Sequence, residues 1–138
     1  LLNTTKSTLH KLQRIQNYVA RSIIPTYPPI PTAELLQHLH WLSIEDRINF
    51  EVAVLVYGVL NSHEPGYLAD LLSYNTTART LRSTDQQLLT VPRCTTAFGG
   101  RAFAVAAPRL WNDIPLSIRS APSVDSFRRQ LKTHYFAV

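Results

Sequence analysis

The sequence predicts a compact, mainly α-helical single domain with one small β-hairpin. Apolar residues recur at helical spacing in three long segments, which predicts three main helices. Hydrophobic residues make up 45% and charged residues 17% of the 138 positions, which is enough for a core and too apolar for a disordered tail. The longest apolar run, residues 52–60, is about half the length that a bilayer requires, so we expect no membrane span.

The first helix is predicted over residues 7–24. Its apolar residues follow one another at steps of three or four and form a single stripe: Leu9, Leu12, Ile15, Val19 and Ile23. Residues 25–31 contain four prolines, Pro25, Pro28, Pro29 and Pro31, which end the helix and favour an extended connector. Thr32 is then expected to cap a short helix that ends near His40.

The central helix is predicted to begin after Ser43. Ser43 and Asp46 resemble a capping box, with Asp in place of the usual Glu. The following segment is apolar almost all round, so we expect it to be the central element of the core. Residues 61–66 are typical of a helix end, and residues 67–72 predict one more short helix. Residues 32–73 together are the predicted helical core.

Residues 74–138 form a predicted basic subregion with mixed structure. Residues 88–91 are β-like, and we expect them to pair with residues 94–98 in a hairpin. The segment 101–111 is Ala-rich and helical in character, but Pro108 is expected to kink or end it. Ser123 is expected to cap a last helix with Val124, Phe127, Leu131 and Tyr135 turned inward.

The positive charge is concentrated in the second half of the chain. Residues 1–78 carry five cations and six acidic residues, whereas residues 79–138 carry nine cations and three acidic residues. Eight of these nine cations are arginine, which suits bidentate phosphate contacts and stacking on bases. A basic partner surface is therefore expected in the second half.

No constellation for catalysis, metal binding or a cofactor is recognisable. Tyr67 to Asp70 resembles a polymerase metal motif only superficially, because Leu71 stands where a second carboxylate is needed. His38 and His40 are two residues apart and match no metal-ligand spacing on a helix. Cys94 is the only cysteine, which fits a structural role in a reducing compartment. We expect no catalytic residue, no metal and no small-molecule substrate.

Binding of nucleic acid is the function that the residues favour. The predicted phosphate contacts are the nine second-half cations: Arg79, Arg82, Arg93, Arg101, Arg109, Arg119, Arg128, Arg129 and Lys132. Tyr74, Phe98 and Tyr135 are candidates for stacking on unpaired bases. The alternative interpretation is a solvated basic surface over a core that contains these aromatics. For Trp41, Phe103, Trp111 and Phe127 we expect the core.

Short motifs along the chain also resemble consecutive landmarks of one known family. They are LQRIQN (12–17), LHWLS (39–43), RINF (47–50), PGYL (65–68), LRS (81–83), VPR (91–93), GRAF (100–103), AAPRLWNDIP (106–115) and FRRQLKTH (127–134). Together they are similar to the segment that follows the reverse transcriptase domain in LINE-type (non-LTR) retrotransposons of the jockey and chicken-repeat kind. The resemblance extends over essentially the whole chain.

The resemblance implies an accessory role beside a polymerase. The parent polyprotein nicks DNA and copies its own RNA from the nick, and RNA, DNA and the reverse transcriptase domain are the implied partners. Residues 1–24 are expected to pack against or continue the polymerase thumb. The chain begins at Leu1 and lacks methionine, so we expect a fragment of a longer polypeptide. The resemblance implies that this polypeptide works in the nucleus and cytoplasm. Related elements can end in a zinc knuckle, from which this sequence departs, since Cys94 is its only cysteine.

Two classes of function therefore remain open at the level of sequence. The first is a nucleic-acid-binding domain that holds template RNA or target DNA. The second is an interaction module that docks on the polymerase or dimerises, in which the Leu9–Ile23 stripe is an exposed interface. A decayed genomic copy or a repurposed host protein would show the same motifs.

Overall fold

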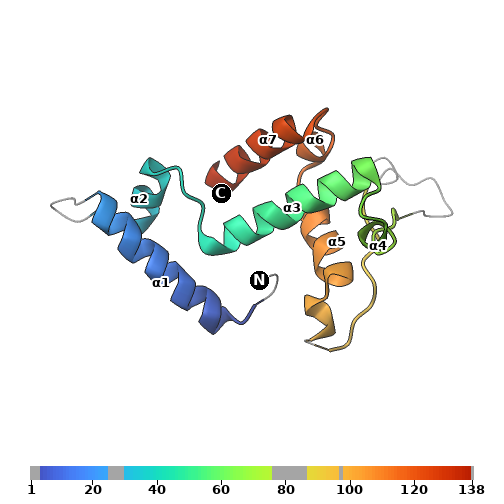
Figure 1. Cartoon of the computed structure of the whole chain (residues 1–138), viewed down its shortest axis with the longest axis horizontal. Coiled ribbons are helices and arrows are strands. Elements are labelled where there is room, and N and C mark those ends of the chain that lie inside the picture. The colour runs from blue at the N-terminus through green and yellow to red at the C-terminus, as the bar shows by residue number, and fades with distance from the viewer. Residues whose placement is uncertain (1–3, 25–29, 76–86, 97, 138) are drawn as a thin grey trace.

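The fold is mainly helical, as the sequence predicts (Figure 1). The computed structural model describes residues 4–24, 30–75, 87–96 and 98–137. Its α-helices are α1 (Lys6–Ile23), α2 (Thr32–His38), α3 (Ile44–Ser62), α4 (Gly66–Ala69), α5 (Phe103–Asp113), α6 (Leu116–Arg119) and α7 (Val124–Ala137), with a short 3-10 helix over Gly99–Arg101. The expected helices over 7–24 and from Ser43 onward are confirmed.

Helix α3 is the axis of the C-terminal region, which comprises α3 to α7. Figure 1 shows α7 along one side of α3, with α5 crossing on the opposite side, and both helices contact α3. Tyr57 of α3 and Phe127 of α7 stack at a centroid distance of 4.4 Å, and Trp111 of α5 lies 5.9 Å beyond Phe127. Phe127 and Trp111 are buried, so the prediction that they anchor the core is confirmed. This aromatic stack joins the three longest helices of the region.

The N-terminal region, α1 and α2, has a small core of its own. Ala20 of α1 and Leu35 and Leu36 of α2 are buried together, and Trp41 packs against them. Two amide side chains join α1 to the segment that leads into α3. Gln16 Nε2 donates to the Leu42 carbonyl oxygen at 2.8 Å, and Gln13 Oε1 accepts from the Ile44 backbone N–H at 2.8 Å. The N-terminal region therefore attaches through polar contacts.

Local hydrogen bonds mark the start of α3 and the end of α2. Ser43 Oγ accepts from the Asp46 backbone N–H at 3.1 Å, which confirms the predicted cap of α3. Helix α2 begins one residue before its expected first position, since Thr32 is already helical and Pro31 precedes it without a side-chain cap. Its end is a left-handed turn at His40 (φ 53°), where the Trp41 N–H bonds the Leu36 carbonyl oxygen at 2.8 Å.

The predicted hairpin between residues 88–91 and 94–98 does not form among the described residues. Leu89 instead forms an isolated antiparallel bridge with Tyr74. On its other side the Asn112 side chain accepts from the Leu89 N–H at 2.8 Å and donates to the Leu89 carbonyl oxygen at 2.9 Å. The amide of Asn112 thus replaces a neighbouring strand, because it offers the same donor and acceptor pair as a backbone.

Pro108 lies within α5 and does not end it, so of the two predicted effects, a kink or an end, the end is wrong. Helix α5 continues five residues beyond Pro108, to Asp113. The ring of Pro108 is fully buried, and Ala107 and Trp111 beside it belong to the core. Packing of this helix against α3 therefore outweighs the hydrogen bond that a proline cannot make.

Helix α7 begins after Ser123, as the sequence predicts. Ser123 Oγ accepts from the Ser126 backbone N–H at 3.2 Å. Phe127 and Leu131 are fully buried and Tyr135 is half-buried, as expected, whereas Val124 is 39% exposed. Val124 stands at the first position of the helix, where it lies beyond the edge of the core.

Candidate nucleic-acid interface

Helix α7 holds three of the predicted phosphate contacts on one exposed surface. Arg128, Arg129 and Lys132 are all exposed, while Phe127 and Leu131 of the same helix are fully buried. Residues 128 and 132 are one helical turn apart, as are 129 and 132, so the three cations share a face. The buried pair fixes the rotation of the helix and thereby directs this cationic row away from the core.

The charge of this row is not neutralised within the described part of the chain. Asp125 is the only acidic residue of α7 and stands in its first turn. No ion pair joins Arg128, Arg129 or Lys132 to a carboxylate among the described residues. Lys132 Nζ instead lies 5.9 Å from the centre of the Phe136 ring, a cation–π distance. The row therefore keeps its positive charge for an external anion.

A cavity of about 210 Å³ opens beside Lys132, where α7 meets the N-terminal region. It is lined by Gln16, His40, Trp41, Leu42, Arg47, Phe50, Glu51 and Lys132. The left-handed backbone of His40 presents its ring toward α7, where it meets the Phe136 ring edge-on at 6.4 Å. The cavity thus combines aromatic walls with Arg47 and Lys132, although Glu51 offsets part of that charge.

A second group of exposed cations lies on the opposite side of α3. It consists of Arg93 before the 3-10 helix, Arg101 within it and Arg109 on α5. Phe98 is 85% exposed in the same segment of chain. Arginines beside an exposed aromatic ring are typical of surfaces that bind single-stranded nucleic acid. We call Arg93, Arg101 and Arg109 the lower group.

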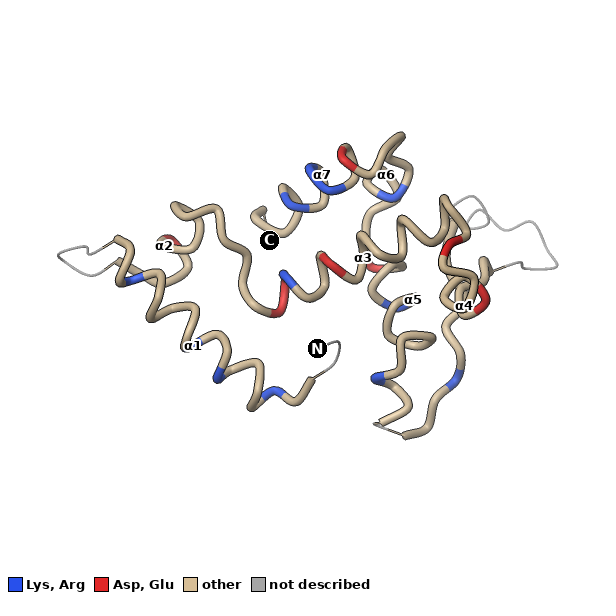
Figure 2. The backbone as a smooth tube through the Cα atoms, in the orientation of Figure 1, with Lys and Arg blue, Asp and Glu red and all other residues tan. Residues whose placement is uncertain are grey.

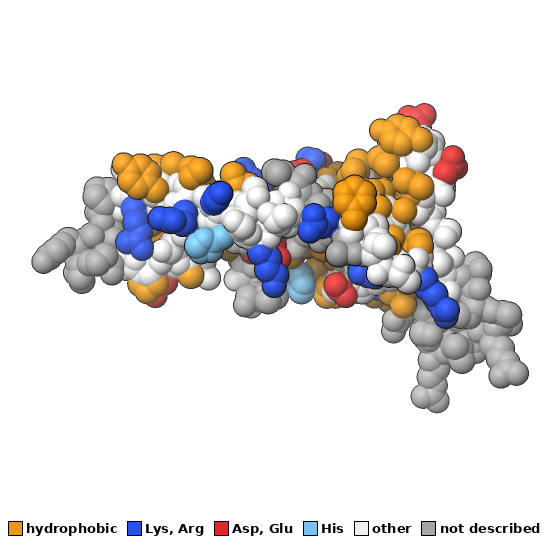
Figure 3. Space-filling model, turned by 90° about the horizontal axis from the view of Figure 1, so that it is seen from below, with side chains coloured by type: hydrophobic (Ala, Val, Ile, Leu, Met, Phe, Trp, Pro, Cys, Tyr) orange, Lys and Arg blue, Asp and Glu red, His pale blue; other side chains and the backbone are white. Residues whose placement is uncertain are grey.

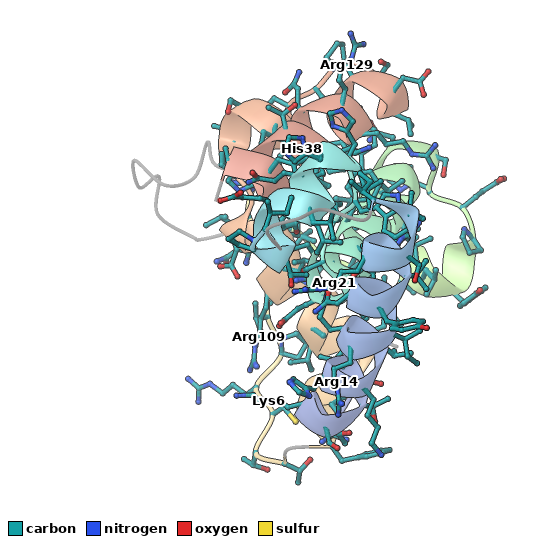
Figure 4. All side chains as sticks on the ribbon, turned by 90° about the vertical axis from the view of Figure 1, so that its left-hand side faces the viewer. Lys6, Arg14, Arg21, His38, Arg109 and Arg129 are labelled. Atoms are coloured by element: carbon teal, nitrogen blue, oxygen red, sulfur yellow. The ribbon has the colours of Figure 1, made fainter. Side chains whose placement is uncertain are left out.

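The predicted cations therefore divide between two faces. Figure 2 shows the Lys and Arg positions of α7 above α3 and those of the α5 side below it. In Figure 4, Arg129 lies at the top of the molecule, whereas Arg109 lies in the lower half with Arg14 and Lys6 of α1. A single straight strand cannot follow both faces at once, so the two groups are separate candidates.

The position of Arg119 differs from the sequence-based prediction that it contacts phosphate. It is only 6% exposed, so the expectation that it is available for phosphate is wrong. Its Nε donates to the Ile114 carbonyl oxygen at 2.8 Å, and its Nη1 donates to the Gln87 carbonyl oxygen at 3.0 Å. Burial lowers the pKa of the Arg119 guanidinium. Arg119 holds the 87–90 segment against the end of α5, which is a structural role.

The remaining predicted residues have different outcomes. Arg79 and Arg82 lie outside the described residues. Tyr74 is 47% exposed and remains a stacking candidate. Tyr135 is half-buried against the core, and its pKa is raised to about 12 by burial first and by Asp46 and Asp113 next. Tyr135 is therefore less suited to stacking on a base than Phe98.

Sequence reasoning missed the cations of α1 as members of a surface. Lys6, Lys11, Arg14 and Arg21 are exposed on a helix that contains no acidic residue. Seen from below in Figure 3, Lys and Arg side chains extend across the molecule from the α1 side toward the α5 side. The cations of α1 are visible in the sequence as a segment without acidic residues. The net charge of residues 1–78 is close to zero, because the acidic residues of this half lie beyond α1.

No group of three His, Cys, Asp or Glu side chains among the described residues could hold a metal ion. Cys94 is free, and its Sγ lies 3.4 Å from the Thr96 carbonyl oxygen in the loop before the 3-10 helix. No helix in the part of the chain that the structure describes is long and apolar enough to cross a membrane.

Comparisons with protein-family models, with curated proteins and with solved structures find no match to this chain.

Proposed function

We propose that this chain is a non-catalytic nucleic-acid-binding domain whose main contact surface is the cationic row of α7. One observation carries the proposal: Arg128, Arg129 and Lys132 are exposed together on a helix anchored by buried residues, without an ion pair to any described carboxylate. A cluster of unpaired cations on a rigid element is costly in self-repulsion unless an anion compensates it. A nucleic-acid backbone supplies such an anion.

The mode of contact follows from the side chains. Arg128 and Arg129 bind phosphate oxygens in bidentate fashion, and Lys132 adds a point charge at the mouth of the cavity. Trp41 and Phe50 in the cavity wall provide faces on which an unpaired base can stack. Contacts of this kind position a strand without reading its sequence.

The resemblance stated above suggests a biological setting for this activity. In that setting the domain holds template RNA or target DNA beside a retrotransposon reverse transcriptase during target-primed reverse transcription. The polymerase and endonuclease chemistry then belongs to other domains of the polyprotein.

The test is the affinity of the purified chain for a labelled single-stranded RNA and a labelled DNA duplex. Measurements at about 50 mM and about 200 mM salt give the number of phosphates neutralised, since log K falls by about 0.7 per phosphate in a single strand and about 0.9 in a duplex. Replacing Arg128, Arg129 and Lys132 together by Gln is expected to reduce the salt slope by about 2 for RNA.

The lower group provides a control that removes the same charge. Replacing Arg93, Arg101 and Arg109 together by Gln changes the net charge by the same three units. If α7 is the contact surface, the α7 variant loses affinity and salt slope while the control retains most of both. Equal losses in the two variants, or no binding by the wild type at low salt, would contradict the proposal.

A further inference from the structure

Helix α1 presents its apolar stripe to the outside. Four of its large hydrophobic side chains are exposed: Ile15 (61%), Tyr18 (75%), Val19 (41%) and Ile23 (52%). Of the five residues of the stripe, Ile15, Val19 and Ile23 are exposed, while Leu9 and Leu12 are half-buried. An exposed stripe of this length on an ordered helix is typical of an interaction surface.

The face of α1 that contacts the rest of the molecule is held largely by amide side chains. Gln16 and Ala20 are the buried residues of the helix. The amide of Gln16 donates to Leu42, that of Gln13 accepts from Ile44, and Gln13 Nε2 also donates to Asn17 Oδ1 at 2.8 Å. Turning the apolar stripe inward would break these bonds and bury unpaired backbone groups, which is costly. The outward orientation is therefore specified by the sequence.

The charges that border this stripe indicate which kind of surface α1 can bind. Lys11 and Arg14 line a shallow groove of about 410 Å³ together with Ile15 and Tyr18. Helix α1 also carries Lys6 and Arg21 and contains no Asp or Glu. Figure 3 shows hydrophobic side chains at the α1 end of the molecule with Lys, Arg and His side chains beside them. The complementary surface is apolar with an acidic border.

We infer that α1 docks onto an apolar protein surface, such as the face of an amphipathic helix, that is bordered by Asp or Glu. A second copy of this chain fits poorly, because pairing α1 with itself brings cations against cations. Nucleic acid could bind Lys11 and Arg14 through its phosphates. The same phosphates would then lie against the apolar side chains of Ile15, Val19 and Ile23, which is unfavourable. A lipid surface favours Trp, Phe and Leu, whereas this stripe is mostly β-branched and holds fixed rotamers that suit a shaped groove.

The inference is independent of nucleic-acid binding and has its own probe. The probe is a labelled amphipathic helical peptide with a Leu stripe bordered by Glu, and its control is the same peptide with Lys at every Glu position. Binding to the full chain is measured by fluorescence anisotropy. We expect the Glu-bordered peptide to bind and the Lys-bordered peptide to bind at least about tenfold more weakly, a difference of 1.4 kcal/mol.

Two variants locate the binding on α1. Replacing Ile15 and Val19 together by Ser is expected to weaken binding of the Glu-bordered peptide by about tenfold or more, since the apolar side chains that it would cover are lost. Replacing Lys11 and Arg14 together by Glu is expected to reverse the preference in favour of the Lys-bordered peptide. All four residues are partly or fully exposed, and the unfolding temperature of each variant is expected to match that of the wild type.

Several outcomes would overturn the inference. They are equal affinity for the two peptides, no affinity for either, and a preference that persists in the Lys11 and Arg14 variant. Stronger binding to phosphatidylserine vesicles than to the Glu-bordered peptide would assign α1 to a lipid surface instead. A dimer in light scattering that the Ile15 and Val19 variant abolishes would assign it to a second copy.

Discussion

The N-terminal and C-terminal regions differ in the size and character of the interior that they bury. In the C-terminal region the interior is aromatic and aliphatic, centred on Phe127, Tyr57 and Trp111. In the N-terminal region a small apolar cluster, Ala20, Leu35 and Leu36, lies beside the amide contacts of Gln13 and Gln16. Helix α1 leaves two isoleucines and a tyrosine exposed. The C-terminal region thus has the larger core, whereas the apolar stripe of α1 lies outside the small N-terminal core. The same contrast predicts that the two regions respond differently to mutation.

The largest effect is expected from Phe127→Ala. Phe127 is fully buried between Tyr57 and Trp111, so the cavity left behind should lower the free energy of unfolding by about 3–5 kcal/mol. Thermal unfolding followed by circular dichroism measures the loss. Phe98→Ala is the matched control, since Phe98 is 85% exposed and its loss should change stability by less than about 0.5 kcal/mol. Similar losses in both variants would contradict the assignment of the core.

The next effect is expected from Arg119→Met, which keeps the length of the side chain and removes its donors. The carbonyl oxygens of Ile114 and Gln87 lose their partner, which should lower the free energy of unfolding by about 2 kcal/mol. Denaturant unfolding measures this loss. Arg128→Met should leave stability within about 0.5 kcal/mol, since Arg128 is exposed. A reduction of RNA affinity by Arg119→Met without loss of stability would return Arg119 to the binding surface.

A smaller effect is expected from Gln16→Ala in the N-terminal region. Loss of the bond to the Leu42 carbonyl oxygen should cost about 1 kcal/mol. Native-state hydrogen exchange should show faster exchange in α1 and α2, while α3, α5 and α7 keep their protection. The control is Gln130→Ala, which removes an exposed bond to Ser126 Oγ in α7. Faster exchange throughout α3 and α7 in the Gln16 variant would mean that the two regions unfold as one unit.

The smallest effect is a pH dependence from Tyr135. Its pKa in the folded chain is about 12, above the ordinary value of 10.0, because burial disfavours the charged form and Asp46 and Asp113 add to this. The stability that this group contributes is therefore fully present below about pH 10 and is lost as the pH rises toward 12. Denaturant midpoints across that range measure it. In Tyr135→Phe the decline should be shallower, and an unchanged decline would assign it to other groups.

Much of the fold follows from local signals in the sequence. The spacing of apolar residues predicts α1, α3 and α7, and Ser43 and Ser123 fix where α3 and α7 begin. The same patterns place Arg128, Arg129 and Lys132 on the outer face of α7. These predictions succeed because they depend on neighbours three or four residues away, which helix geometry brings together.

The features that the sequence did not reveal depend on contacts between distant residues. The partner of Leu89 is the side chain of Asn112, 23 residues away, and a strand pattern cannot indicate an amide that replaces a strand. Arg119 is buried because it reaches the carbonyl oxygen of Gln87, 32 residues away. The orientation of α1 is set by Gln13 and Gln16, whose backbone partners lie 31 and 26 residues away. The spacing of apolar residues predicts the apolar stripe of α1, but it does not predict whether the stripe faces the core or the solvent.

The central claim is that the two regions carry two separate surfaces, and a crossed binding experiment tests it most directly. Three proteins are compared: the wild type, the Ile15→Ser and Val19→Ser double variant, and the α7 variant with Gln at positions 128, 129 and 132. Each is titrated with single-stranded RNA and with the Glu-bordered peptide.

The account predicts that the α7 variant loses affinity for RNA and keeps its affinity for the peptide, while the α1 variant shows the reverse. Loss of RNA affinity in the α1 variant as large as that in the α7 variant, with both proteins folded, would contradict it.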